Sequence, residues 1–367
     1  MSTSDTPSKR ASSRPVRARR GRGALSNTAG RFESMHSEAF DDGWDTLDED
    51  NRPATQLQRD TSKSVLVFNQ SPDVPFDRSV NPYRGCEHGC VYCFARPTHA
   101  YLGLSPGIDF ETRIFTKPDA AKLLEEALRK PGYSCEPIAL GINTDGYQPS
   151  ERKLRITRSI LEVLRDFRHP VSIVTKSALV ERDLDLLAEM AADNLVSVCV
   201  SLTTLDAELA RKMEPRAAAP HRRLQTIEAL TRSGVPVTAL LAPVIPVLTD
   251  RELDDLVARV TAAGAISAGY ILLRLPLEIA DLFEEWLREH YPLKADHVMK
   301  RVKDTRGGNV YDSRFGHRMR GTGEYAAIIA QRFELSRKKH GLGDRKPTLN
   351  TRLFRVPVRS GDQIGLF

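Results

Sequence analysis

Residues 81–96 read NPYRGCEHGCVYCFAR and hold three of the five cysteines of the chain. Cys86, Cys90 and Cys93 form the spacing C-x3-C-x2-C, and a glycine precedes each of the first two. Glycine allows a loop to wrap closely around whatever its thiols bind. An odd number of cysteines in a long chain argues against a disulfide framework, so the cluster indicates metal or redox chemistry.

Three clustered thiols are compatible with more than one kind of site. A structural zinc ion has four protein ligands, and His88 is the nearest candidate for the fourth. A four-iron four-sulfur (4Fe-4S) cluster held by three cysteines keeps one iron open, which can bind a substrate or cofactor directly. Electron carriers of the ferredoxin type use four cysteines per cluster. We therefore expect a catalytic cluster, with zinc as the alternative.

The composition is that of a soluble globular protein, with 40% of the 367 residues hydrophobic and 28% charged. A chain of this length can bury a large core in one sizeable domain or two smaller ones. It has no apolar run of the roughly 18 residues that a membrane span needs. Its first residues, MSTSDTPSKR, also lack the apolar segment of a secretory signal. We expect a cytoplasmic protein without membrane contact, and the formal charge of +6 permits an anionic partner such as nucleic acid.

The distribution of charge predicts where the folded part begins. Residues 1–32 are basic and residues 33–50 are acidic, and both carry few large apolar side chains. Such a segment cannot offset its ordering entropy by burial, so we expect residues 1–60 to be a disordered charged tail. Its basic half could be an arm for nucleic acid, but we favour a solvated tail. The core domain is expected over residues 61–300 and a basic C-terminal extension, packed on it, over residues 301–367.

From residue 78 onward, short apolar runs alternate with stretches of helical period. This pattern is typical of a repeated βα unit, and a first strand at about residues 79–83 gives six units. Strand-helix-strand repeats form parallel sheets, and six units fall short of the eight that close a full barrel. We predict an α/β fold, a partial (β/α)6 barrel with its active site at the carboxyl ends of the strands. The other strands are expected at residues 137–142, 171–175, 195–202, 235–245 and 268–275.

Serine residues mark the start of two of the intervening helices. Ser150 precedes a helical stretch over residues 151–167, and Ser177 precedes one over residues 178–192. In the second stretch one apolar face should pack on the sheet. That face consists of Val180, Leu184, Leu187 and Met190.

The segment CEHGCVYC, with the aromatic Tyr92 directly before the third cysteine, resembles the signature of the radical SAM superfamily, C-x3-C-x-aromatic-C. Further segments follow in the order seen in the spore photoproduct lyase branch of that superfamily. They are VTKS (174–177), VSL (200–202), MEPRAAAPHRRLQTIEAL (213–230) and LLAPVIP (240–246). The resemblance covers about residues 76–250. The runs NTDGYQPSE (143–151) and DSRFGHRMRGTGEY (312–325) are similar to uncharacterised bacterial proteins described as spore photoproduct lyase-like.

The resemblance implies two cofactors, a 4Fe-4S cluster and S-adenosylmethionine (SAM). The cysteines would hold three irons, and the fourth iron would chelate the amino and carboxylate groups of SAM. An external donor of the flavodoxin or ferredoxin type would supply the electron that cleaves SAM to methionine and a 5′-deoxyadenosyl radical. Glu214 and Arg223 also match the branch, and for them we prefer an ion pair that braces the loop. The residues that the resemblance places at SAM are Tyr92, Asn143, Asp145, Lys176, Ser201 and, through its backbone near the adenine, Ala242.

The polar residues of this set also have more ordinary interpretations. Lys176 matches a lysine that contacts the SAM carboxylate, but it could be a solvated cap of a strand. Ser201 matches a serine at the ribose or methionine part, yet a strand-end hydroxyl bonded to backbone would look the same. Asn143 and Asp145 match the approach to the SAM amino group, whereas Asp-Gly is also a common turn.

One departure from the lyase changes the expected reaction. In spore photoproduct lyase a cysteine three residues before the strand-end aspartate returns a hydrogen atom to the thymine radical, and Ile142 occupies that position here. The tyrosine after the third cysteine is replaced by Phe94. Cys135 lies too early in the sequence to substitute, and Cys199 is expected to be a buried structural residue. We predict SAM cleavage for hydrogen abstraction from an unidentified substrate, without repair of thymine lesions. The alternative is a metal-stabilised nucleic-acid-binding protein without SAM chemistry.

The C-terminal extension is basic, with Tyr311, Phe315 and Tyr325 interleaved. Such a mixture could hold a nucleic-acid backbone and stack bases. We favour the solvated face of helices that close the barrel. The apolar end DQIGLF (362–367) is expected to dock on the barrel.

Overall fold

The computed structural model describes residues 21–33, 54–344 and 347–358. Its main sheet has the strand order β10-β9-β8-β7-β6-β3-β2, and every neighbouring pair is parallel except β2 and β3. Because the six parallel strands follow one another in chain order, their crossovers lie on one face of the sheet. The predicted partial (β/α)6 barrel is confirmed, with β2 as an added edge strand. The strands are β2 (Leu66–Phe68), β3 (Arg78–Val80), β6 (Ile138–Leu140), β7 (Val171–Thr175), β8 (Val196–Ser201), β9 (Val237–Val244) and β10 (Ser267–Leu272).

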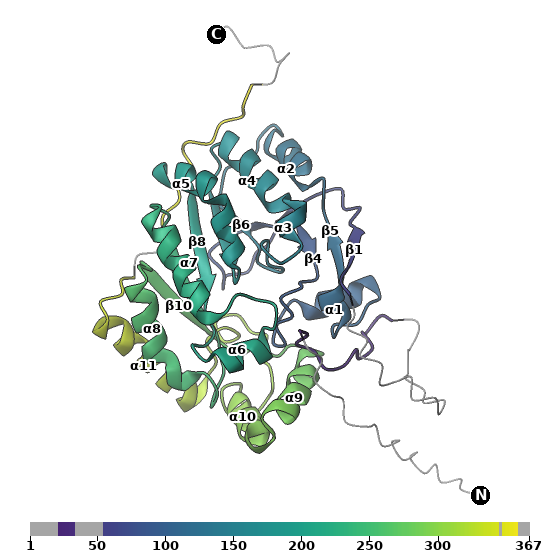
Figure 1. Cartoon of the computed structure of the whole chain (residues 1–367), viewed down its shortest axis with the longest axis vertical. Helices are drawn as coiled ribbons and strands as arrows, with labels where there is room; N and C mark the ends of the chain where they lie inside the picture. Colours follow the sequence, from purple (N-terminus) through teal and green to yellow (C-terminus); the bar gives the residue numbers. More distant parts are fainter. Residues whose placement is uncertain (1–20, 34–53, 345–346, 359–367) are drawn as a thin grey trace, which may run out of the picture.

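Helices connect successive strands and cover the outer face of this sheet (Figure 1). Among the described residues, no helix is both long enough and apolar enough to cross a membrane. The α-helices are α1 (Asp109–Thr112), α2 (Ala120–Leu128), α3 (Glu151–Leu154), α4 (Ile156–Asp166), α5 (Leu184–Ala192), α6 (Ala207–Met213), α7 (Pro220–Arg232), α8 (Leu253–Ala262), α9 (Ile279–His290), α10 (Pro292–Asp304) and α11 (Gly323–Lys339). The 3-10 helices are η2 (Arg96–Leu102), η3 (Ala178–Asp183) and η4 (Asp250–Glu252).

A smaller sheet lies beside the first barrel strand, in the order β1-β5-β4. Its strands are β1 (Gln56–Arg59), β4 (Tyr83–Arg84) and β5 (Arg113–Thr116). The predicted first strand at residues 79–83 is therefore two strands, β3 in the main sheet and β4 in the small one. Pro82 lies between them, and since proline has no backbone N–H it interrupts the ladder.

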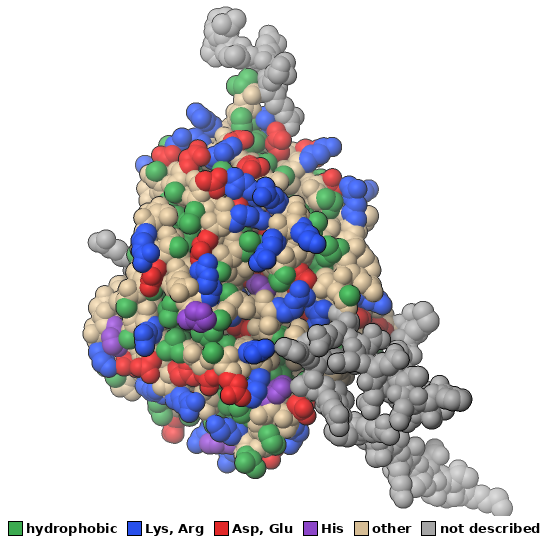
Figure 2. All heavy atoms as spheres, in the orientation of Figure 1, with side chains coloured by type: hydrophobic (Ala, Val, Ile, Leu, Met, Phe, Trp, Pro, Cys, Tyr) green, Lys and Arg blue, Asp and Glu red, His purple; other side chains and the backbone are tan. Residues whose placement is uncertain are grey.

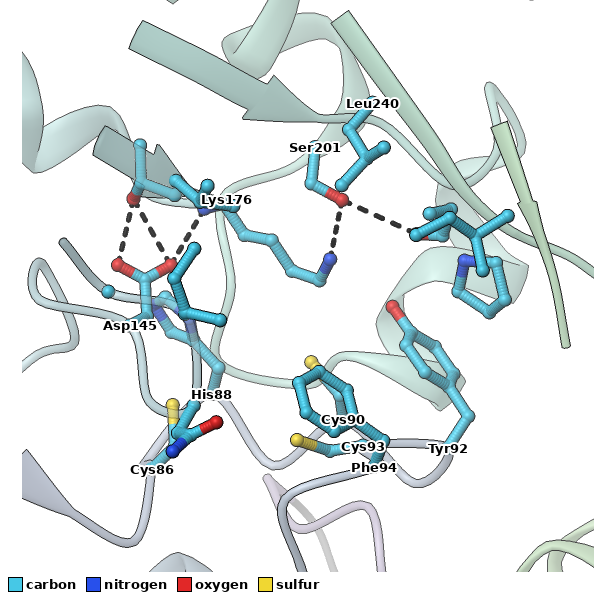
Figure 3. A pocket seen from close by; sticks show the side chains of 18 of the residues that line it. Cys86, His88, Cys90, Tyr92, Cys93, Phe94, Asp145, Lys176, Ser201 and Leu240 are labelled. Atoms are coloured by element: carbon cyan, nitrogen blue, oxygen red, sulfur yellow. Dashed lines mark hydrogen bonds and ion pairs between the residues drawn. The ribbon is translucent and has the colours of Figure 1, made fainter. Parts of the chain in front are cut away.

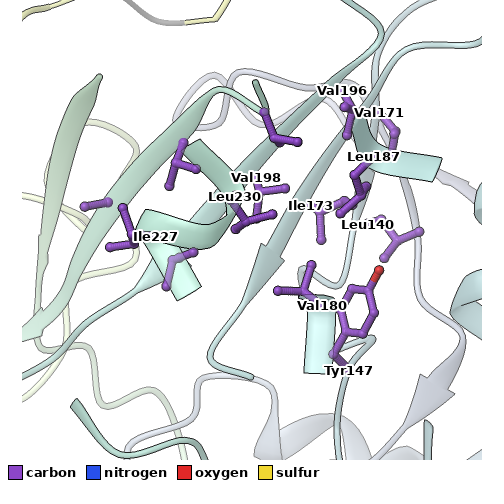
Figure 4. Packing of buried hydrophobic residues seen from close by; sticks show 14 of the residues in the cluster. Leu140, Tyr147, Val171, Ile173, Val180, Leu187, Val196, Val198, Ile227 and Leu230 are labelled. Atoms are coloured by element: carbon purple, nitrogen blue, oxygen red, sulfur yellow. The ribbon is translucent and has the colours of Figure 1, made fainter. Parts of the chain in front are cut away.

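The core lies between the main sheet and the helices (Figure 4). On β7 and β8 alternate side chains are fully buried on the helix side, namely Val171, Ile173, Val196 and Val198. Leu187 of α5 and Ile227 and Leu230 of α7 belong to the same cluster. Because side chains alternate along a strand, the intervening residues face the barrel interior.

Ser177 caps the helical stretch that follows β7. Its backbone is extended, and its hydroxyl accepts a hydrogen bond from the amide of Leu179 at 3.2 Å. The stretch begins as η3 and continues as α5. The other predicted helix, at residues 151–167, is divided into α3 and α4 by Arg155, whose φ is 53°. Of the predicted apolar face, Val180, Leu187 and Met190 are fully buried and Leu184 is partly buried.

Parts of the tail that we predicted to be disordered have a defined structure. In residues 21–33, Ala24 and Leu25 are fully buried, and residues 56–59 form β1. The prediction for residues 1–60 is therefore wrong for these stretches, because their few apolar side chains and backbone amides find partners far along the chain. Residues 1–20 and 34–53 of the tail lie outside the described residues.

The C-terminal extension packs on the barrel, but its predicted start at residue 301 falls inside α10. That helix is continuous because one apolar stripe runs along it and packs with α9 in a single cluster. The stripe consists of Ala295, Val298, Met299 and Val302.

Helix α11 packs on α8, where Ser336 donates a hydrogen bond to Asp254 at 2.8 Å. Tyr325 donates its hydroxyl to Asp250, so this aromatic residue has a structural contact. The final residues, DQIGLF, lie outside the described residues.

Candidate active site

One cavity of about 900 Å³, including its open mouth, lies at the carboxyl ends of the barrel strands (Figure 3). The loop over residues 85–94, called the cysteine loop below, forms one wall of the cavity. The ends of β6, β7, β8, β9 and β10 form the other walls. All the residues that the sequence placed at the cofactors line this cavity. They are Cys86, Cys90, Tyr92, Cys93, Asn143, Asp145, Lys176, Ser201 and Ala242.

The cysteine loop requires glycine at two positions. Gly85 and Gly89 have φ values of +80° and +68°, which other residues rarely adopt. A Cβ on Gly85 would lie 2.9 Å from a backbone oxygen, and one on Gly89 would lie 2.7 Å from the carboxylate of Glu111. The amide of Cys93 donates to the carbonyl of Cys90 at 3.2 Å, which places the last two cysteines in one turn.

A buried ion pair supports the cysteine loop from the side opposite the cavity. Arg96 donates to the carbonyl oxygens of Cys90 at 2.8 Å and Gly89 at 3.2 Å, and it pairs with Glu111 at 2.5 Å. Both charged side chains are fully buried. Glu111 also accepts the amides of Gly23 and Ala24 from the N-terminal segment. A Cβ on Gly23 would lie 1.8 Å from the Gly89 carbonyl oxygen, so this segment touches the loop directly.

We expect Glu111→Gln to destabilise the protein by about 3 kcal/mol, because it leaves the buried Arg96 guanidinium without a counter-charge. Urea unfolding of the iron-free protein measures the change. The control is Glu126→Gln, an exposed residue 4.0 Å from Lys122, which should cost less than about 0.5 kcal/mol. Equal stability of the two variants would show that the ion pair does not support the loop.

Tyr92 connects the cysteine loop to the strand ends. Its hydroxyl donates to the buried carboxylate of Glu214, which also accepts from Thr203 at 2.8 Å. Glu214 forms an ion pair with Arg223, as the sequence predicted. The hydrogen bond between Tyr92 and Glu214 was not predicted from the sequence, because the two residues lie far apart in the chain.

Lys176 reaches across the cavity rather than into solvent. Its Nζ donates to the Ser201 hydroxyl at 2.6 Å and lies 3.9 Å from the carboxylate of Glu214. Burial lowers its pKa. The interpretation of Lys176 as a solvated strand cap is therefore wrong, since only 17% of the side chain is exposed. Ser201 in turn donates to the carbonyl oxygen of Ala242 at 3.3 Å.

Asp145 holds the ends of β6 and β7 together. Its carboxylate accepts from the Thr175 hydroxyl at 2.8 Å and from the amides of Lys176 at 2.7 Å and Tyr147 at 2.8 Å. Burial opposes its ionisation, but the neighbouring His88 and these donors hold the pKa of Asp145 below its usual range. Asp145 thus positions these strand ends, and both Asp145 and Asn143 line the cavity.

His88, the candidate fourth zinc ligand, lines the same cavity as the cysteines and faces Asp145. Its Nδ1 is 3.3 Å from the Asp145 carboxylate. Within residues 21–33, 54–344 and 347–358, no three His, Cys, Asp or Glu side chains converge on a point that suits one metal ion. A structural zinc ion needs all four ligands at about 2.0–2.3 Å. The geometry therefore does not favour the zinc alternative.

The cavity contains no fourth thiol. Ile142, which the sequence resemblance aligns with the hydrogen-donating cysteine of the lyase, lines it. Neither Cys135 nor Cys199 lines it, and Cys199 is a half-buried residue of β8. Tyr147 is fully buried in the helix-side core (Figure 4).

Sequence reasoning missed Arg274, which lines the cavity from the end of β10. Its guanidinium lies over the ring of Phe94, 5.2 Å from the ring centroid. The available signal was a charged residue near the end of the apolar run at residues 268–275, at the edge where α/β folds place their sites.

The sequence profile of the radical SAM superfamily matches residues 80–260, the segment that carries this cavity. The chain belongs to the radical SAM superfamily, whose cofactors are a 4Fe-4S cluster and SAM.

Two proteins with similar sequences are uncharacterized. An uncharacterized protein of Mycobacterium tuberculosis is 42% identical over 247 residues, which is 65% of this chain and 73% of that protein. An uncharacterized protein of Methanocaldococcus jannaschii is 26% identical over 213 residues, 58% of this chain and 76% of that protein.

Solved structures of spore photoproduct lyase share the fold. The complex with dinucleoside spore photoproduct has a TM-score of 0.54 and 14% identity, covering 77% of this chain and 79% of the lyase. A variant of the lyase with bound AdoMet and the same lesion has a TM-score of 0.55 and 13% identity, covering 77% of this chain and 78% of the lyase. At this identity the likeness concerns the fold alone.

Proposed function

We propose that the protein reductively cleaves SAM to a 5′-deoxyadenosyl radical, which abstracts hydrogen from a substrate other than spore photoproduct. The observation that carries this proposal is the arrangement of three cysteines, Lys176 and Ser201 around one cavity. The family supplies the cofactors, and the residues present fit them.

The three thiols fit a cluster better than a single ion. In a 4Fe-4S cluster each cysteine binds a different iron, so the sulfurs do not need to converge on one point. Burial raises the pKa of Cys86, Cys90 and Cys93, which opposes free thiolates in this loop. Bound iron would supply the positive charge that buried thiolates require.

The remaining residues would bind and orient SAM. When bound, the cluster would pass one electron from an external donor to the SAM sulfonium, releasing methionine and the radical. The Lys176 ammonium and Ser201 hydroxyl would hold the SAM carboxylate, and Asn143 would face the amino group. The Ala242 backbone would contact the adenine. Tyr92, through Glu214, would fix the loop against the strand ends.

The side chain of Ile142 supports a reaction in which no protein residue donates a hydrogen atom back to the substrate radical. An apolar side chain at this position shields a substrate radical instead of quenching it. The abstracted hydrogen atom would then stay on 5′-deoxyadenosine, so that SAM is consumed and 5′-deoxyadenosine is released as a co-product.

The face shown in Figure 2 does not favour nucleic acid binding without SAM chemistry. On the face in Figure 2, lysine and arginine side chains are interspersed with acidic ones over the helices. No continuous basic field crosses that face, and such a field is the expected electrostatic footprint of a nucleic-acid site.

An oligonucleotide that contains spore photoproduct tests the proposed substrate restriction. We expect the reduced protein to form 5′-deoxyadenosine while it leaves the lesion unchanged, as measured by chromatography of the digested DNA. Conversion of the lesion to thymine at the rate of SAM cleavage would show that another hydrogen donor reaches the cavity. Ile142→Cys is the informative variant, since it restores a thiol at the position of the lyase donor.

A further inference from the structure

We propose that the cavity takes an anionic substrate, whose carboxylate or phosphate group is bound by Arg274. This inference rests on the proposed function, because it assigns a substrate to the same cavity. Arg274 lies two residues after β10, and its side chain lines the cavity together with the cysteine loop.

The guanidinium of Arg274 is incompletely satisfied. Among the described residues it forms no ion pair, and its one hydrogen bond goes from Nη1 to the sulfur of Met319 at 3.2 Å. A thioether is a weak acceptor. The Nε atom is buried and has no hydrogen-bond partner within the described part of the chain. A half-buried cation with an unpaired N–H is unfavourable unless an anion joins it.

Neighbouring arginines are engaged in holding the fold. Arg306 donates to the carbonyl oxygens of His317 and Leu273, each at 2.8 Å. Arg318 pairs with Asp73 at 2.6 Å, and this carboxylate interacts with Arg274 only at longer range, without an ion pair. These contacts leave Arg274 as the arginine that faces the cavity at this edge.

The loop over residues 306–322 fixes the position of Arg274. It joins the two edges of the open barrel. At β10, the Leu272 N–H donates a hydrogen bond to the Met319 carbonyl oxygen at 2.9 Å. Beyond β2, the Gly316 N–H donates to the Asp73 carboxylate at 2.7 Å. The same loop supplies the Met319 sulfur. The guanidinium is thus held in place before any ligand arrives, which lowers the entropy cost of binding.

Arg274 would address a different anionic group from Lys176. Lys176 follows β7 and Arg274 follows β10, three strands further along the barrel sheet. A substrate between them could place its carbon skeleton against Phe94, which is 41% exposed. Its oxyanion could then take the two-pronged hydrogen bonding that arginine offers to carboxylate and phosphate.

The test uses reconstituted protein saturated with SAM, so that Lys176 is already occupied. Inorganic phosphate and, separately, ¹³C-labelled acetate are titrated, and the ³¹P and ¹³C line widths give dissociation constants. We expect saturable binding of at least one anion, with an affinity loss of at least about tenfold in Arg274→Gln. The anion that binds more tightly identifies the group. Arg314→Gln is the control, because Arg314 is exposed and paired with Asp312 at 2.7 Å.

Absence of saturable binding to the wild type, or equal affinity in Arg274→Gln, would overturn the proposal. Arg274→Lys keeps the charge without the planar fork and should lose less affinity than the glutamine variant. Iron content and 5′-deoxyadenosine formation are measured on the same samples. If the protein binds no iron or forms no 5′-deoxyadenosine, while anion binding still depends on Arg274, the proposed function is wrong and the proposed anion site is still supported.

Discussion

Replacing Cys86, Cys90 or Cys93 by alanine is expected to reduce the iron content of anaerobically prepared protein from about four atoms per chain to nearly none. Each thiolate would hold a different iron of the proposed cluster, and the fourth iron would have no protein ligand to compensate. Loss of one cysteine therefore leaves two attachment points in a loop whose other contacts are hydrogen bonds. Elemental analysis and the visible absorbance of the cluster measure the loss.

The chain supplies its own controls in Cys135 and Cys199, which do not line the cavity. Alanine at either position should leave the iron content unchanged. Full iron in a Cys86, Cys90 or Cys93 variant, or stoichiometric zinc in the wild type, would contradict the assignment of the loop.

Lys176→Ala is expected to weaken SAM binding by about 10- to 100-fold without loss of iron. Charged hydrogen bonds contribute roughly 1.5–3 kcal/mol each, and a factor of ten corresponds to about 1.4 kcal/mol. Lys176 already lies 2.6 Å from Ser201, so its ammonium is positioned across the cavity before SAM binds. Anaerobic equilibrium dialysis with labelled SAM measures the affinity.

Lys153→Ala is the matched control, because Lys153 is an exposed lysine on α3. It should bind SAM as tightly as the wild type. An unchanged affinity in Lys176→Ala would mean that the ammonium serves the Ser201 and Glu214 network and not the cofactor.

The barrel strands could be predicted because parallel strands buried on both faces appear in the sequence as nearly continuous apolar runs. The edge of the sheet that carries the candidate site followed from the same pattern, whereas Asp145, Lys176 and Ser201 were named from the resemblance to the radical SAM superfamily. The strand β1 could not be predicted, because its four residues QLQR are all exposed and have no apolar signal.

Long-range contacts account for what else the sequence did not indicate. The segment at residues 21–33 has a composition typical of disorder, yet two of its amides bind Glu111, nearly ninety positions further along the chain. The direction of the Arg274 side chain likewise depends on a loop that returns from residues 306–322 to the edge of β10. Neither Glu111 nor the loop over residues 306–322 can be predicted as a contact from the sequence around residues 21–33 or Arg274.

The central claim is tested most directly by reducing the reconstituted protein with dithionite, adding SAM and measuring methionine and 5′-deoxyadenosine by chromatography. The account predicts equal amounts of both products from the wild type and from Cys199→Ala, and neither product from Cys86→Ala. An iron-loaded wild-type protein that binds SAM and releases no 5′-deoxyadenosine would contradict it.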